Sequence, residues 1–72
     1  MKGNFFYRRM GKNISSVRKK KNISQEGLAF LSHIDRTYLA RIEEGKANPT
    51  IKVLHKIAIQ LQVKMQELVN EG

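Results

Sequence analysis

Apolar residues recur at helical spacing in several separate segments of the chain, and no segment alternates as a strand would. In the first of these segments, four apolar residues between Phe6 and Val17 fall three or four positions apart. This spacing predicts a first helix over about 6–21 and leaves residues 1–5 as a loose end. The pattern as a whole predicts an all-α chain.

Two short helices follow the first one closely. Ser24 is a good N-cap for a second helix over about 25–32, and Asp35 is a good N-cap for a third helix that Gly45 ends. Neither segment is long enough to be stable alone. We therefore expect one of these helices to support the other, and the second of the pair to carry a function.

The remaining third of the chain predicts two more helices. Pro49 marks a loop, and Thr50 caps a fourth helix over about 51–62 with an apolar stripe. A short fifth helix follows at about 65–70. The prediction is a five-helix domain over residues 6–72.

Composition restricts the class of protein. The chain has 72 residues and no Cys, which indicates one domain, no disulfide framework and a reducing compartment. The two histidines, His33 and His55, make a poor metal site at this separation. The sequence contains neither a signal peptide nor an apolar run long enough to span a membrane. We expect a cytoplasmic protein without cofactor, metal or catalytic residues.

The net charge of +8 is large for so short a chain. Residues 1–36 hold nine Lys or Arg against two acids, whereas residues 37–72 hold five against four. Such charge favours a polyanion, either nucleic acid or an anionic membrane surface. A membrane-surface binder is the remote alternative, because the first helix lacks the amphipathic pattern of helices that lie at a membrane surface. An enzyme is not expected, since the chain has no phosphate-binding glycine loop and is too short to enclose a cleft.

The spacing of several residues together resembles the helix-turn-helix domain of the phage-repressor and Cro type, from Met10 to Val69. The matching residues are Arg18, Ser24-Gln25-Glu26, Leu28-Ala29, Ile34, Leu39, Ile42-Glu43, Gly45, Pro49 and Leu61-x-Val63. The resemblance implies the five-helix lambda-repressor-like fold, with the helix-turn-helix at the second and third helices. It also implies a structural ion pair between Arg18 and Glu43.

Two residues depart from the family pattern. His33 stands at a turn position that is commonly Gly and usually has a positive φ, which His tolerates better than most residues. Gly27 lies inside the second helix and costs about 1 kcal/mol of helix propensity relative to Ala. Neither change affects the outer face of the third helix.

The resemblance implies that the third helix enters the major groove of duplex DNA. The residues expected to contact bases are Arg36, Thr37, Ala40 and Arg41. An arginine offers two parallel donors that match guanine O6 and N7. The residues expected to contact the DNA backbone are Ser24, Gln25, Tyr38, Lys46, Asn48, Thr50 and Lys52. Tyr38 could equally pack on the second helix.

The family binds two-fold operators as dimers, so we expect a homodimer. The candidate dimer surface is Ile59, Val63, Met65, Leu68 and Val69. Asp35-Arg36-Thr37-Tyr38, followed by Ile42-Glu43 and Gly45, is similar to controller proteins of restriction–modification systems. A phage repressor or an antitoxin fits the same residues almost as well. We expect no small-molecule effector domain, because almost nothing follows the fifth helix.

Overall fold

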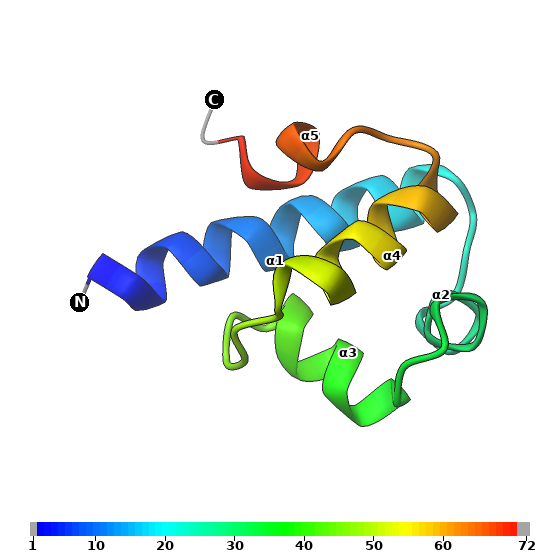
Figure 1. Cartoon of the computed structure of the whole chain (residues 1–72), viewed down its shortest axis with the longest axis horizontal. Coiled ribbons are helices and arrows are strands. Elements are labelled where there is room, and N and C mark those ends of the chain that lie inside the picture. The colour runs from blue at the N-terminus through cyan, green and yellow to red at the C-terminus, as the bar shows by residue number, and fades with distance from the viewer. Residues whose placement is uncertain (1, 71–72) are drawn as a thin grey trace.

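The computed structural model describes residues 2–70, with side chains from Phe5 onward, and this part of the chain folds into five α-helices without a strand (Figure 1). The helices are α1 (Lys2–Lys20), α2 (Gln25–Ser32), α3 (Arg36–Glu43), α4 (Ile51–Leu61) and α5 (Met65–Val69). The all-α, five-helix prediction is confirmed. The observed ends of α2 to α5 lie within about one residue of the predicted ends.

The start of α1 differs from the prediction. The helix begins at Lys2 rather than at Phe6, so residues 2–5 are helical and not a loose end, while Met1 lies outside the described residues. Sequence reasoning placed the start too late because the first turn has no acidic residue and contains Gly3 and Asn4, which are poor helix formers.

Three of the inter-helix connections use the same backbone turn. Each has one residue in the left-handed region, at φ 59° for Asn22, 58° for His33 and 59° for Gln62. The next residue donates its backbone N–H to a carbonyl five positions earlier, as in a Schellman motif. These bonds join Ile23 to Arg18, Ile34 to Ala29, and Val63 to Ala58, at 3.1, 3.0 and 3.1 Å. The residue after that begins the next helix as its N-cap.

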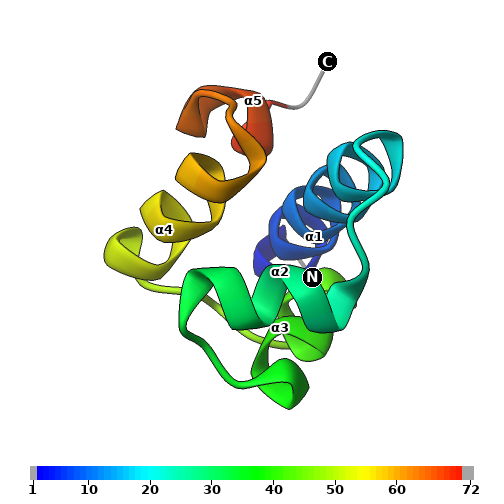
Figure 2. The ribbon, with the colours of Figure 1, turned by 90° about the vertical axis from the view of Figure 1, so that its right-hand side faces the viewer.

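The core lies where the five helices meet. Figure 2 shows α1 and α4 on either side of the molecule, with the α2–α3 pair beneath them and α5 at the top. The helix α1 packs against α3 and α5, and α2 packs against α3 and α4. The buried core residues are Met10, Ile14, Leu28, Ala29, Leu39, Ile42, Leu54, Ile57, Ala58, Leu61 and Leu68.

Two residues of α1 fix the neighbouring helices in a way that the sequence did not reveal. Gly11 lies against the end of α3, where an added Cβ would collide with the backbone carbonyls of Ile42 and Glu43. The Asn13 side-chain amide donates 2.9 Å hydrogen bonds to the carbonyls of Leu68 and Asn70, which fastens α5 to α1. The position of α1 therefore determines where both α3 and α5 lie.

Candidate nucleic-acid interface

The helix α3 has a buried side and an exposed side. Asp35 caps it by accepting a 3.1 Å hydrogen bond from the Thr37 backbone N–H, as predicted. Leu39 and Ile42 are fully buried. On the opposite side, Arg36, Thr37 and Arg41 are exposed and Ala40 is half-buried. Three of the four residues predicted to contact bases are thus fully available to a partner.

The turn before α3 sets the direction of that helix. Ser24 caps α2 by accepting a 2.9 Å hydrogen bond from the Gly27 backbone N–H. At the other end of α2, His33 adopts the left-handed conformation expected for the position where the family commonly has Gly. Ile34 then packs against the core and Asp35 starts α3. The helix-turn-helix geometry predicted from the sequence is confirmed.

A buried ion pair clamps α1 to the end of α3. The Arg18 Nε atom lies 2.8 Å from Glu43 Oε2, and Arg18 Nη2 lies 3.0 Å from Glu43 Oε1. A third guanidinium nitrogen, Nη1, donates to the Ile23 carbonyl at 2.9 Å. Only 10% of the Arg18 side chain and 6% of the Glu43 side chain are exposed. The predicted structural ion pair is confirmed, and every nitrogen of the guanidinium is used within the fold.

Gln25 joins this clamp, which the sequence did not predict. Its side-chain amide donates a 3.1 Å hydrogen bond to Glu43 Oε1, and the residue is half-buried. Gln25 stands at the first position of α2, where backbone N–H groups and the helix dipole favour an anion. Its side chain therefore links the start of α2 to the end of α3.

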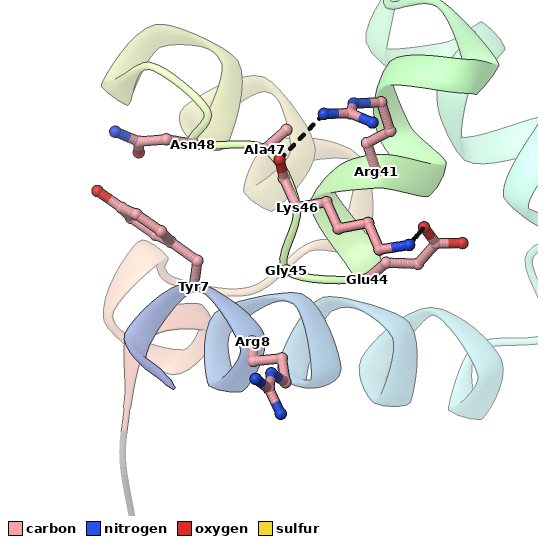
Figure 3. A pocket seen from close by; sticks show the side chains of 8 residues that line it. All are labelled: Tyr7, Arg8, Arg41, Glu44, Gly45, Lys46, Ala47 and Asn48. Atoms are coloured by element: carbon pink, nitrogen blue, oxygen red, sulfur yellow. Dashed lines mark hydrogen bonds and ion pairs between the residues drawn. The ribbon is translucent and has the colours of Figure 1, made fainter. Parts of the chain in front are cut away.

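The loop between α3 and α4 lies against the N-terminal half of α1 and forms a pocket of about 570 Å³ (Figure 3). Arg41 Nη2 donates to the Lys46 carbonyl at 3.2 Å, and the Lys46 ammonium lies 3.7 Å from Glu44 Oε1. Figure 3 shows Tyr7 rising from α1 toward Asn48. The guanidinium of Arg41 is therefore held near the loop on which backbone contacts were predicted.

The other residues predicted to contact the DNA backbone lie at the edges of this surface. Asn48 and Lys52 are exposed. Thr50 is also exposed, and its hydroxyl oxygen accepts a 3.1 Å hydrogen bond from the Val53 backbone N–H, so it caps α4 as predicted. Tyr38 is half-buried and packs against the core, which favours the packing alternative for this residue.

One residue of the predicted dimer surface was assigned wrongly. Leu68 is fully buried in the core of its own chain, so it is not part of a free surface. Ile59 is 55% exposed, whereas Val63, Met65 and Val69 are half-buried against the core. A five-residue helix shows too little periodicity to separate its inner side from its outer side.

Exposed apolar side chains that the sequence analysis missed lie on α2. Phe30 is 80% exposed and Leu31 is 44% exposed. Leu31 and Ile59 line one shallow pocket between α2 and α4. Helical spacing alone did not distinguish these residues from the buried Leu28 and Ala29.

Within residues 2–70, no three His, Asp or Glu side chains come close enough to hold a metal ion. No helix in this part of the chain is long and apolar enough to cross a membrane. The surface of α2, α3 and the following loop exposes cations, amides and hydroxyls.

Comparison with known proteins supports this description of the fold. A family model described as helix-turn-helix matches residues 14–68. The control protein C.MunI of a Mycoplasma species is 38% identical over 64 residues, which cover 88% of this chain and 86% of that protein. The immunity repressor of Bacillus phage phi105 is 32% identical over 62 residues, and the chain spans only 43% of that repressor's length.

A solved structure resembles the chain over almost its full length. The restriction–modification controller protein C.Esp1396I, in a tetramer bound to its natural 35-base-pair operator, superimposes with a TM-score of 0.77. The two sequences are 32% identical, and the match covers 92% of this chain and 97% of that one. The similarity includes the helices α2 and α3 and the helices on either side of them.

Proposed function

The chain belongs to the helix-turn-helix family, and we propose that it is a sequence-specific regulator of transcription that binds duplex DNA as a dimer. In this proposal it acts as the controller proteins of restriction–modification systems do. One observation carries this proposal: α3 is clamped on its inner side and presents Arg36, Thr37 and Arg41 on its outer side. A rigid helix with an exposed polar face is what readout in the major groove requires.

In this proposal, the outer face of α3 reads bases. Arg36 and Arg41 each supply two donors for guanine O6 and N7, and Thr37 meets a thymine methyl or a base edge. Ala40 leaves room for the bases between them. Arg41 exchanges its hydrogen bond to the Lys46 carbonyl for one to a base when it binds.

The surrounding residues hold the DNA backbone and set the register of α3. Ser24 and Gln25 approach a phosphate at the start of α2, where the helix dipole favours negative charge. Lys46, Asn48, Thr50 and Lys52 approach a second phosphate segment from the loop and the start of α4. Tyr38 lies at the border between the residues proposed to contact bases and those proposed to contact the DNA backbone. None of these contacts depends strongly on base sequence.

A dimer through α4 and α5 places two copies of α3 on the two halves of a pseudo-palindromic operator. Ile59 supplies the most exposed apolar contact, and Val63, Met65 and Val69 supply the exposed edges of their side chains. The related controller protein C.Esp1396I is a tetramer on its operator. Two dimers of this chain are proposed to bind side by side on DNA in the same way. A regulator of this kind works in the cytoplasm, where the promoter is, and needs no cofactor.

An immunity repressor is the second candidate, because the phage phi105 repressor matches most of this chain. Both candidates bind operators through the same helix. The promoter that carries the operator distinguishes them: a restriction gene cluster favours the controller, and a prophage lysis–lysogeny region favours the repressor.

The test is selection of binding sites from random duplex DNA by the full chain. We expect an inverted repeat whose half-site centres lie about one helical turn apart. On the selected site, the logarithm of the binding constant should fall with the logarithm of salt concentration, with a slope of about −5 to −9. Failure to enrich any sequence, or a slope near zero, contradicts the proposal.

A further inference from the structure

The outer face of α1 is strongly basic, and none of the contacts proposed so far uses it. Residues 2–20 contain seven Lys or Arg and no Asp or Glu. Arg18 alone among them belongs to the clamp. Arg8, Lys12 and Lys19 are exposed and Arg9 is half-buried. Half of the positive charge of the protein therefore lies on a helix outside the helix-turn-helix pair.

The N-terminal half of α1 concentrates this charge on one face. Phe5, Arg8, Arg9 and Lys12 are spaced three, four and seven positions apart, which places them together on a helix surface. They line a pocket of about 410 Å³ with Glu43. The Arg9 guanidinium carbon lies 5.4 Å from the centre of the Phe5 ring, so the ring supports the arginine. We refer to Arg8, Arg9 and Lys12 as the α1 basic cluster.

The α1 basic cluster adjoins both segments proposed to hold the DNA backbone. On one side is Glu43, which lines the cluster's pocket and accepts the hydrogen bond from Gln25 at the start of α2. On the other side, Arg8 also lines the pocket formed by Lys46 and Asn48. Both carboxylate oxygens of Glu43 accept hydrogen bonds from Arg18.

Close packing holds the cluster in place. An added Cβ on Gly45 would come within 2.6 Å of the Arg8 Cα atom, and one on Gly11 would collide with the end of α3. These close approaches pack α1 against the end of α3 and the loop that follows it. Cations on a fixed helix lose less conformational entropy on binding than cations on a mobile tail.

We propose that the α1 basic cluster is a third contact to the phosphate backbone of duplex DNA, an inference that rests on the proposed function. About 6 Å of helix separates Arg8 from Lys12. Duplex DNA presents roughly three or four phosphate charges over that distance. The cluster is continuous with two surfaces that approach DNA, and this continuity favours DNA over an acidic protein as its partner. The contact adds affinity and salt dependence without adding base preference.

The test compares two double variants that lose the same charge. Arg8→Gln/Lys12→Gln removes two cations of the cluster, and Lys56→Gln/Lys64→Gln removes two from α4 and the start of α5. Each variant keeps a polar side chain at both positions and lowers the net charge from +8 to +6. Thermal unfolding first establishes that both variants are folded, and binding to the selected operator is then measured between about 50 and 200 mM salt.

We expect the cluster variant to reduce the magnitude of the salt slope by about 1–2 per subunit, since each neutralised phosphate contributes about 0.9. Its preference between the operator and single-base mutants should not change. The control variant should alter the slope by less than about 0.5. Equal changes in the two variants, or an unchanged slope in the cluster variant, overturn the third contact. Loss of sequence discrimination by the unmodified protein instead overturns the proposed function itself.

Discussion

The turn from α2 to α3 and the turn from α4 to α5 have the same backbone, but they serve different purposes. His33 and Gln62 both adopt φ close to 58°, and a β-branched residue packs against the core after each of them. The helices that follow differ. Asp35 caps the eight-residue α3 with its side chain. The helix α5 has five residues, and the backbone N–H of its N-cap residue Lys64 donates to Glu67 Oε2 at 3.3 Å.

The two helices also differ in what holds them. The end of α3 is tied to α1 by a nearly buried ion pair, whereas α5 is tied to α1 by a neutral amide that donates to two carbonyls. On the outer side, α3 carries exposed arginines, and α5 carries Gln66 and Glu67. The same turn therefore precedes two helices that differ in the contacts that hold them and in the charge they expose.

The largest effect on stability is expected from removing the ion pair that holds the end of α3. Glu43→Ala leaves the Arg18 guanidinium buried without a counter-charge, which should lower the free energy of unfolding by about 3–5 kcal/mol. Denaturant and thermal unfolding measure the loss. The control is Glu44→Ala, whose carboxylate is 57% exposed and pairs loosely with Lys46, and which should change stability by less than about 0.5 kcal/mol. An unchanged melting temperature for Glu43→Ala would contradict the structural role of the pair.

The next largest effect concerns readout. Arg36→Ala and Arg41→Ala should each weaken operator binding by about 1–3 kcal/mol and relax base preference at one position in each half-site. Titration against the operator and its single-base mutants, at fixed salt, measures both effects. The matched change on the other helix is Gln66→Ala, which should leave base preference intact. A uniform loss of affinity with full preference retained would show that α3 does not read bases.

A smaller effect distinguishes backbone contacts from base contacts. Lys46→Ala should weaken binding to every site about equally and reduce the salt slope by about one charge per subunit. The lysine follows Gly45 and lies beyond the end of α3, so we expect it to contact phosphates rather than bases. Salt titrations on the operator and on an unrelated duplex give the measurement. A change in preference at a single base pair would assign Lys46 to readout instead.

The smallest effect tests whether the two turns are equivalent. His33→Gly and Gln62→Gly should each raise the free energy of unfolding by up to about 1 kcal/mol, because Gly adopts the left-handed region without the steric cost that other residues carry. Asn22→Gly should raise the free energy of unfolding by a smaller amount, since Asn tolerates the left-handed conformation better than His or Gln. Unfolding in denaturant would reveal the differences. Destabilisation by His33→Gly alone would mean that the imidazole makes a contact that the turn geometry does not explain.

Local signals in the sequence predicted most of the fold. The caps Ser24, Asp35 and Thr50 fixed the starts of α2, α3 and α4, because a side-chain oxygen that accepts a backbone N–H depends only on neighbouring residues. The Arg18–Glu43 pair was predicted from the family resemblance, because local patterns do not indicate contacts between residues far apart in the chain.

The errors involve contacts between residues far apart in the chain. The close approach of Gly11 to α3 and the bond from Gln25 to Glu43 depend on where helices cross. Leu68 was misplaced because α5 is too short for its apolar residues to define a face. The proposed base and phosphate contacts remain predictions, which the binding experiments above address.

The division of α3 into a clamped inner side and an exposed outer side has a consequence for how such regulators diverge. Arg36 and Thr37 are exposed and make no contribution to the core, so we expect their replacement to change the preferred operator at little cost in stability. We therefore expect substitutions at these two positions, together with Arg41, to be a route by which a second regulator comes to prefer another promoter. Two copies of the gene in one cell can then evolve into independent circuits while Leu39, Ile42 and Glu43 stay the same.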